Sequence, residues 1–434
     1  MKKVALHTLG CKLNYTETST IGGEFQSKGF SVSDFDSKAD VYVINTCTVT
    51  ENAERECRQI VRRALRNNPE GFVIVTGCYA QLRPEDLQKI EGVDLILGSN
   101  EKFEIFNFID SFEKKNLACI YTTPAESLND FGPAYSSSGN DRTRAFLKIQ
   151  DGCDYKCTFC TIPQARGESR SLSIDEIVPQ FQQLLSRNFK EIILTGVNVG
   201  DYGAKIETNL NQLVRELLRV RGDFRIRISS IEPNLLTDEI IELVCSEEKL
   251  CKHFHIPLQS GSDTVLKQMK RRYLSELYFN RIEKVKSLIP NCGIGVDVIV
   301  GFPGETDEDF ERTYNFLNEL PISYLHVFTY SERPGTPAAE MKFQIPKNIR
   351  KERTNCLRIL SAKKKHAFYS DMIGKKERVL FEHREQDGDF KGFSSNYIRV
   401  VHKPIIDLTN KFADFLINGI QNEYCVGDIP LHLN

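Results

Sequence analysis

The stretch that decides the fold is "DGCDYKCTFC" (151–160), in which Cys153, Cys157 and Cys160 have the spacing CxxxCxxC. Cysteine thiolates are the usual ligands of iron–sulfur clusters. Three thiolates can hold three irons of a four-iron cluster and leave the fourth iron open to a small molecule. A zinc site is the alternative, but structural zinc takes four ligands, and no second cysteine pair follows at zinc-finger spacing. The spacing therefore predicts an open [4Fe–4S] cluster.

An aromatic residue, Phe159, directly precedes the last of these cysteines. With it, the motif resembles the one that defines the radical S-adenosylmethionine (SAM) superfamily. The resemblance implies that the open iron binds the amino and carboxylate groups of SAM. It also implies that the reduced cluster splits SAM into methionine and a 5′-deoxyadenosyl radical. In such enzymes the cofactors carry the difficult chemistry and the protein positions them.

The composition is that of an ordinary globular chain with no membrane segment. Its 434 residues suffice for two to four domains. No apolar run reaches the ~20 residues that span a bilayer, and the polar start "MKKVALHTLGCKLN" does not resemble a signal peptide. Thirteen cysteines scattered over so long a chain indicate reduced thiols rather than disulfides. We therefore expect a cytoplasmic protein, and the net charge of −2 requires any nucleic-acid binding to come from local patches.

The first ~125 residues alternate apolar runs with helix-like stretches such as 51–67. Strands alternating with helices predict a parallel sheet with helices on its faces, so the fold class is α/β. We expect this domain to span 1–125. The strand-like runs are 3–9, 41–45, 72–76 and 94–97.

Three further cysteines each follow one of these strands: Cys11, Cys47 and Cys78. The carboxyl ends of parallel strands share one edge of the sheet, where α/β proteins bind ligands. Three unrelated, part-buried cysteines are the alternative, since cysteine is often buried. The same position recurring in three successive units favours a second cluster.

The rest of the chain divides into a linker, a longer β/α series and a short β-rich end. Residues 126–141 are rich in Pro, Gly, Ser and Asn and predict a linker. Residues 142–370 contain six strand-like runs, two short of a closed eightfold barrel, so we expect a partial (β/α)6 barrel with its site at the carboxyl strand ends. Residues 371–434 predict a small antiparallel β-barrel. The barrel runs are 145–150, 191–195, 225–229, 253–258, 295–301 and 323–329, and the C-terminal runs are 377–383, 390–401, 412–419 and 425–433.

Six segments together resemble the methylthiotransferase family of radical SAM enzymes over essentially the whole chain. They are "TLGCKLNYTET", "INTCTVTENAERE", "TGCYAQ", "DGCDYKCTFCTIPQARGESRS", "IPLQSGSDTVLKQMKRRY" and "IVGFPGETDEDF". The resemblance implies an auxiliary-cluster domain, a radical SAM partial barrel and a C-terminal RNA-binding barrel called TRAM. It assigns one [4Fe–4S] cluster to Cys11, Cys47 and Cys78, and the SAM-binding [4Fe–4S] cluster to Cys153, Cys157 and Cys160. It places the SAM pocket at Phe159, Thr195, Gly196, Asn198, Ser229, Glu232 and Asp297.

The family reaction replaces a C–H bond by C–S–CH3, using one SAM to methylate a sulfur and a second to activate the substrate carbon. The segments "GCKLNYTET", "NTCTVT" and "GCYAQ" are most similar to sequences of one branch of the family. That branch acts on N6-threonylcarbamoyladenosine, the adenosine 3′ of the anticodon in tRNA. This implies a tRNA partner and an electron donor. The alternatives are the isopentenyladenosine branch, the branch acting on a ribosomal-protein aspartate, and a noncatalytic RNA-binding iron–sulfur protein.

Two sets of basic residues are candidates for contact with such a substrate. The threonylcarbamoyl carboxylate calls for an Arg or Lys partner, and Arg166, Arg170, Arg271 and Arg272 are the candidates. Residues 342–376 carry eleven Lys and Arg against two Asp and Glu. They are either a solvated helix face or an RNA-facing patch that includes Lys363, Lys364 and Lys365.

Overall fold

The computed structural model describes residues 1–48, 53–136, 143–385, 388–403 and 406–430. It begins with a six-stranded parallel sheet in the order β2-β1-β3-β4-β5-β6. The four predicted strands are confirmed, and two three-residue strands, too short to give a sequence pattern, extend the sheet at its two edges. The strands are β1 (Lys3–Thr8), β2 (Ser31–Ser33), β3 (Val41–Thr46), β4 (Phe72–Gly77), β5 (Leu95–Leu97) and β6 (Cys119–Tyr121).

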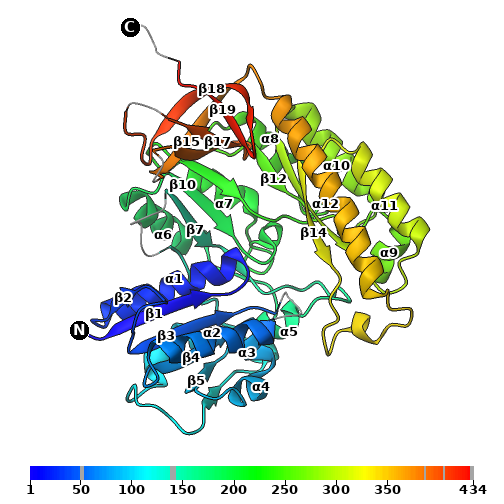
Figure 1. Ribbon diagram of the computed structural model, residues 1–434. Coiled ribbons are helices and arrows are strands. Elements are labelled where there is room, and N and C mark those ends of the chain that lie inside the picture. The colour runs from blue at the N-terminus through cyan, green and yellow to red at the C-terminus, as the bar shows by residue number, and fades with distance from the viewer. Residues whose placement is uncertain (49–52, 137–142, 386–387, 404–405, 431–434) are drawn as a thin grey trace.

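Helices cover both faces of this sheet, as Figure 1 shows. Helices α2 (Ala53–Asn67), α3 (Cys78–Leu82) and α4 (Pro84–Gln88) pack on one face, and α1 (Lys12–Ser27) packs on the other. The chain turns outward from β1 to β2 and then returns to β3 on the other side of β1. The carboxyl ends of β1 and β3 therefore form the topological switch point, which is where open α/β sheets bind ligands.

The central strands form the predicted partial barrel. Strands β7, β10 and β11 pair in parallel, as do β12, β13 and β14. A parallel bridge between Ser230 and His255 joins the two groups into one curved, six-stranded wall. The strands are β7 (Arg144–Lys148), β10 (Glu191–Thr195), β11 (Arg225–Ile228), β12 (His253–His255), β13 (Gly293–Val300) and β14 (Tyr324–Thr329).

Helices line the outside of this wall, where their apolar faces join the largest core of the protein. Ser173 and Thr306 begin two of them with capping boxes. The helices are α6 (Ile174–Ser186), α7 (Leu210–Leu218), α8 (Asp238–Ser246), α9 (Asp263–Gln268), α10 (Ser275–Leu288), α11 (Asp307–Glu319) and α12 (Lys347–Ser370). No helix in the described ranges combines the length and apolarity that a bilayer crossing requires.

The C-terminal strands close into a five-stranded barrel in the order β15-β16-β17-β19-β18. The expectation of one strand over 390–401 is wrong. A turn with Tyr397 at φ 72° splits it into β16 and β17. Most pairs are antiparallel, but β17 meets β19 in parallel. The strands are β15 (Lys376–Arg384), β16 (Phe390–Ser394), β17 (Arg399–His402), β18 (Phe412–Gln421) and β19 (Tyr424–Asp428).

Candidate active site

The loop that carries Cys153, Cys157 and Cys160 follows β7, at the carboxyl edge of the barrel. A two-stranded ladder of β8 (Gln150–Asp151) and β9 (Arg170–Ser171) closes its base, and the Cys153 amide donates to Gly167 O at 3.1 Å. Gly152 has φ +70°, and a Cβ at this position would overlap the Glu168 carbonyl. Only glycine therefore fits the start of the loop.

Hydrogen-bond donors surround the three sulfurs. The amides of Tyr155 and Ile162 lie 3.4 Å from Cys153 Sγ and 3.5 Å from Cys160 Sγ. The Nη1 atom of Arg271 lies 3.1 Å from Cys157 Sγ. Burial raises the pKa of the Cys153 thiol to about 12 and that of Cys160 to about 11, so these sulfurs need a positive partner to become anionic. Donors aimed at buried and half-buried sulfurs fit an iron–sulfur cluster, whose ligands are tuned by such hydrogen bonds.

The second triad converges at the switch point of the N-terminal sheet. Cys11 precedes α1, Cys47 follows β3, and Cys78 begins α3. A Cβ on Gly10, which has φ +96°, would overlap the Cys47 side chain, so the first two loops touch. Burial raises the pKa of the Cys78 thiol, and Cys11 is near enough to add to the rise. The three cysteines, spread over almost seventy residues of sequence, therefore meet at one edge and fit a second cluster.

A buried ionic network fixes the two triads relative to each other. Arg166, at the end of α5 (Ile162–Arg166), places Nη1 2.8 Å from Glu17 Oε1 and 3.0 Å from Asp151 Oδ1. Glu17 also lies 2.8 Å from Lys102 Nζ, and Asp151 lies 2.7 Å from Lys148 Nζ. Burial acts to raise the pKa of Glu17, but Arg166, Lys102 and Lys148 together hold it at about 2. The network is thus ionised and joins α1 of the sheet to the loop that carries the SAM-cluster triad.

The two cysteine loops also touch directly, beside a cavity of about 220 Å³. The hydroxyls of Thr48 and Thr161 lie 3.2 Å apart. Arg333, in the loop after β14, donates from Nη1 to Thr48 O and lines the cavity together with Cys160 and Phe159. Burial lowers the pKa of Arg333, while Cys160 and Cys47 oppose the fall. One guanidinium therefore lines a cavity with Cys160 of one triad and contacts the residue that follows Cys47 of the other.

The predicted SAM pocket lies at the carboxyl ends of β10 and β11. Gly196 packs so closely on Gln150 that a Cβ would come within 2.9 Å of its backbone carbonyl, and the Asn198 amide donates to Gln150 Oε1 at 2.9 Å. Thr195 is buried at the end of β10. Within the described residues, the buried Asn198 Nδ2 and Ser229 Oγ have no hydrogen-bond partner. Such orphaned polar atoms fit a polar ligand, and SAM offers hydroxyl and carboxylate partners.

Glu232 and Asp297 extend this pocket. Glu232 pairs with Arg271, whose guanidinium also reaches Cys157, so the carboxylate lies close to the SAM-cluster loop. Asp297 lines the cavity beside Phe159 and Cys160, and its Oδ1 lies 2.7 Å from His255 Nε2. The structure thus brings the predicted pocket residues to the cysteine loop from both halves of the barrel.

The four predicted substrate arginines have partners inside the protein. Arg166 is buried in the ionic network, and its Nε lies 3.3 Å from Cys78 Sγ. Arg170 lies 3.5 Å from Asp151 and donates to three backbone carbonyls. Arg271 joins Cys157 to Glu232. Arg272 stacks on Tyr155 with its guanidinium carbon 3.8 Å from the ring centre. These contacts occupy Arg166, Arg170 and Arg271, whereas Arg272 is exposed and donates one hydrogen bond, to Asp154 O, within the described residues.

The basic stretch is partly structural as well. Arg350 and Arg353 are buried on α12 and pair with Glu332 and with Glu305. Of the predicted RNA contacts, Lys364 donates to the carbonyls of Asn318 and Leu320 at 2.6 and 2.7 Å, and Lys365 lies 3.6 Å from Glu423. Lys363 is exposed. Packing therefore uses several charges of this stretch, and an RNA-facing patch that includes Lys363, Lys364 and Lys365 stays a prediction.

Arg333 and the network residues Glu17, Asp151, Lys102 and Lys148 are site residues that the sequence did not reveal. Arg333 lies in "SERPGTP" (331–337), directly after the sixth barrel strand. Because barrel sites form at the carboxyl ends of the strands, the position of Arg333 after the sixth strand would have indicated it. Glu17 gave no comparable signal, because it lies within the ordinary polar spacing of α1.

Comparison with known proteins agrees with this arrangement. A family model described as the radical SAM superfamily matches residues 147–317, and one described as uncharacterized protein family UPF0004 matches residues 3–98. The solved structure of the radical SAM methyltransferase TsrM from Kitasatospora setae shares the fold, with a TM-score of 0.55, 14% identity, and coverage of 78% of this chain and 77% of that one. The partial barrel with its open cysteine triad is that of a radical SAM enzyme.

The sequence relatives narrow this class. A Bacillus subtilis protein named threonylcarbamoyladenosine tRNA methylthiotransferase MtaB is 43% identical over 95% of this chain and 93% of its own length. A Thermotoga maritima protein of the same name is 34% identical over 98% of this chain and 96% of its own length. A Fusobacterium nucleatum protein named tRNA-2-methylthio-N(6)-dimethylallyladenosine synthase is 34% identical over 99% of this chain and its own full length. This chain belongs to the radical SAM methylthiotransferase family.

Proposed function

We propose that this enzyme converts N6-threonylcarbamoyladenosine next to the anticodon of tRNA to its 2-methylthio derivative. The observation that carries the proposal is the contact between the two cysteine loops beside one cavity. The Thr48 and Thr161 hydroxyls lie 3.2 Å apart, and Arg333, which lines the cavity with Cys160, donates to Thr48 O, next to Cys47. A sulfur held at one triad and a radical generated at the other must reach the same substrate carbon. The relatives named for threonylcarbamoyladenosine, with up to 43% identity, support this branch.

Each triad would hold one [4Fe–4S] cluster: Cys153, Cys157 and Cys160 the SAM-binding one, and Cys11, Cys47 and Cys78 the auxiliary one. When bound, these groups supply reductive cleavage of SAM and a sulfur donor. The chain itself binds and orients. Asn198, Ser229 and Glu232 present hydrogen-bonding groups to SAM, and Arg271 offsets the negative charge of Cys157 at 3.1 Å.

Arg333 is the residue that we assign to the threonylcarbamoyl carboxylate. It lines the cavity beside Cys160 and also donates to Thr48 O of the auxiliary cysteine loop, and a guanidinium pairs bidentately with a carboxylate. Arg166, Arg170, Arg271 and Arg272 were the candidates from sequence, and each already contacts other groups of the protein. Their role at the substrate stays a prediction. So do the electron donor, the cytoplasmic location and the domain division at 125, 141 and 370.

Mass spectrometry of tRNA nucleosides tests the proposal. A strain that lacks the protein should accumulate N6-threonylcarbamoyladenosine, and the purified, reconstituted enzyme with SAM and a reductant should convert it to the 2-methylthio product. If the enzyme converts isopentenyladenosine and not N6-threonylcarbamoyladenosine, it belongs to the same branch as the Fusobacterium relative. If no 5′-deoxyadenosine forms with any RNA, the noncatalytic iron–sulfur alternative is correct.

A further inference from the structure

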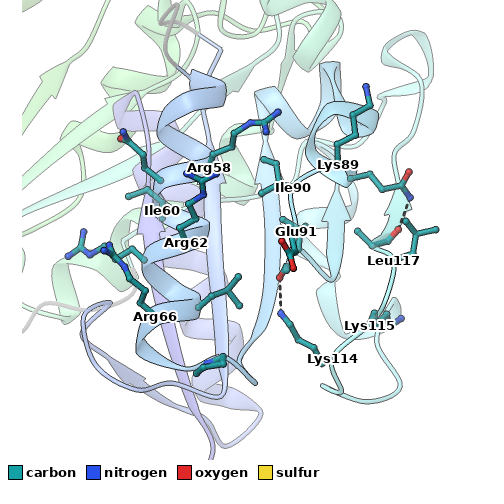
Figure 2. A pocket seen from close by; sticks show the side chains of 18 of the residues that line it. Arg58, Ile60, Arg62, Arg66, Lys89, Ile90, Glu91, Lys114, Lys115 and Leu117 are labelled. Atoms are coloured by element: carbon teal, nitrogen blue, oxygen red, sulfur yellow. Dashed lines mark hydrogen bonds between the residues drawn. The ribbon is translucent and has the colours of Figure 1, made fainter.

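A broad groove lies on the N-terminal sheet domain, outside the site described above. Helix α2 forms one wall, and residues 88–93 and 114–118 form the other. Its volume is about 1330 Å³. Figure 2 shows Arg58, Arg62 and Arg66 along the helix, with Lys89 and Lys115 on the opposite wall. We propose that this groove binds the phosphate backbone of the tRNA substrate.

The charge of the groove differs from that of the whole chain. Seven Lys and Arg line it against the single acid Glu91, although the chain as a whole has a net charge of −2. At least three of the seven have nearby carboxylates: Arg63 pairs with Asp36, Lys89 with Asp86 and Lys114 with Asp94. Even after these pairs, the lining retains an excess of positive charge.

The excess is concentrated on α2. Arg58, Arg62 and Arg66 recur every four residues and so lie on one helix face, about 6 Å apart along its axis. Arg62 and Arg66 are exposed and form no ion pair with the part of the chain that the structure describes. Evenly spaced guanidiniums on one rigid helix form a regular row of phosphate-binding groups.

The other lining residues favour an RNA backbone over bases. Between the charges lie aliphatic groups such as Ile60, Ile90 and Leu117, and the described residues place no aromatic side chain in the lining. Reading of unpaired bases generally uses aromatic stacking. Phosphate contacts position a nucleic acid without reading its sequence.

The direction of the groove fits RNA that leads away from the active site. Helix α2 follows Cys47 at the carboxyl edge of the sheet and ends at Asn67, before β4 begins at the opposite edge. The row of arginines therefore runs from the cysteine edge across the domain. An adenosine held at the cavity would leave the adjoining stem free to follow this row. This inference rests on the proposed function for the identity of the RNA.

Binding of an unmodified tRNA transcript to the reconstituted enzyme tests the inference. Fluorescence anisotropy over a salt series would compare the native protein with Arg62→Gln/Arg66→Gln. We expect binding roughly tenfold weaker at low salt, and a slope of log affinity against log salt reduced by about 1.5, because two phosphate contacts are lost. The matched control is Arg215→Gln/Arg219→Gln, which removes two exposed arginines from the region of α7. It should keep the native slope.

The outcomes separate the inference from the proposed function. Binding is measured without turnover. A failure to form the methylthio nucleoside would therefore refute the proposed reaction, but it would not affect the comparison of RNA binding by the α2 and α7 variants. If the α2 variant shows the same slope as the α7 control, the groove does not bind RNA. If that slope is unchanged while reduction of the clusters by a flavodoxin slows, the groove binds an acidic protein instead, and the inference is wrong. Should the double variant unfold, Arg62→Gln and Arg66→Gln singly should each lower the slope by about 0.8.

Discussion

Arg166 Nε lies 3.3 Å from Cys78 Sγ, although the two residues belong to different halves of the site. Arg166 ends the helix that follows the SAM-cluster cysteines, and Cys78 belongs to the auxiliary triad. The same guanidinium reaches Glu17 at 2.8 Å, and both partners are fully buried. Arg166 is held by Cys78, Glu17 and Asp151, and it therefore fixes the separation of the two triads. A fixed separation is required if sulfur from one triad and a radical from the other are to reach the same substrate.

The two triads should bind iron independently. Anaerobic reconstitution should load about eight irons, in two four-iron clusters. Replacing Cys153, Cys157 and Cys160 by Ala should remove about half the iron and all formation of 5′-deoxyadenosine. Replacing Cys11, Cys47 and Cys78 should also remove about half, but should retain 5′-deoxyadenosine formation. Full iron content in this second variant would refute the assignment of a second cluster.

Gly152→Ala should disrupt the SAM-cluster loop. Its Cβ would overlap the Glu168 carbonyl at a φ of +70°, so the loop has to shift. We expect loss of about half the iron and a lower melting temperature. Gly29→Ala is the matched control, because Gly29 has φ +84° and a Cβ added there would meet no atom within 4 Å. It should cost only about 1 kcal/mol of backbone strain and keep all the iron. Equal effects of the two substitutions would contradict the steric argument.

Arg333→Gln should weaken use of the threonylcarbamoyl substrate. Loss of a charge-assisted pair costs about 1.5–3 kcal/mol, so kcat/KM should fall roughly 10- to 150-fold, mainly through KM. Arg83→Gln is the control, since the half-buried Arg83 contacts the same loop at Pro334 O, 3.4 Å away. Iron content is measured in both variants. If Arg333→Gln lowers turnover of isopentenyladenosine tRNA equally, the arginine does not recognise the carboxylate.

Glu377 should make stability depend on pH near neutrality. Burial raises its pKa from 4.5 to about 7, against the opposing effects of Lys375 and Arg225. Between pH 4.5 and pH 7 the Glu377 carboxyl is deprotonated in the unfolded chain but still protonated in the folded chain. The free energy of unfolding therefore falls as the pH rises to 7 and then levels off. Glu377→Gln should therefore be more stable than the native protein at pH 8, by up to about 3 kcal/mol.

Thermal unfolding followed by circular dichroism at pH 5.5 and pH 8 measures this difference. The advantage of Glu377→Gln should shrink at pH 5.5, where the native carboxyl is largely protonated. Glu423→Gln is the control, because the Glu423 side chain is 71% exposed, and it should give no such trend. A constant difference between the Glu377 variant and the native protein would show that Glu377 does not titrate in this range.

Neighbouring lysines on α12 should differ in what they do. Lys364 caps the carbonyls at the end of α11, at 2.6 and 2.7 Å, so Lys364→Met should cost about 1–2 kcal/mol of stability. Lys363 is exposed, and Lys363→Met should leave stability unchanged. Equal melting temperatures for the two variants would contradict the capping role. Their tRNA affinities then show whether Lys363 belongs to an RNA surface.

The sequence alone determined the features that are local or follow from topology. The spacing of Cys153, Cys157 and Cys160 lies within one loop, so it is legible without a fold. Cys11, Cys47 and Cys78 could be grouped because parallel strands place their carboxyl ends at one edge. Apolar runs likewise predicted β3 and β4, which are buried on both faces.

Only the tertiary structure decided which charges belong to the interior. Arg166, Arg353 and Lys364 look like surface residues in the sequence. The structure buries Arg166 and Arg353 and half-buries Lys364 against a helix end, because a charge leaves water only where distant partners compensate it. Their partners Glu17, Glu305 and the Asn318 carbonyl are 46 to 149 residues away in sequence, beyond the reach of any local pattern. The split of 390–401 at Tyr397 also depends on contacts between segments that are distant in the sequence. A closing barrel, rather than the propensity of that segment, set where its strand had to end.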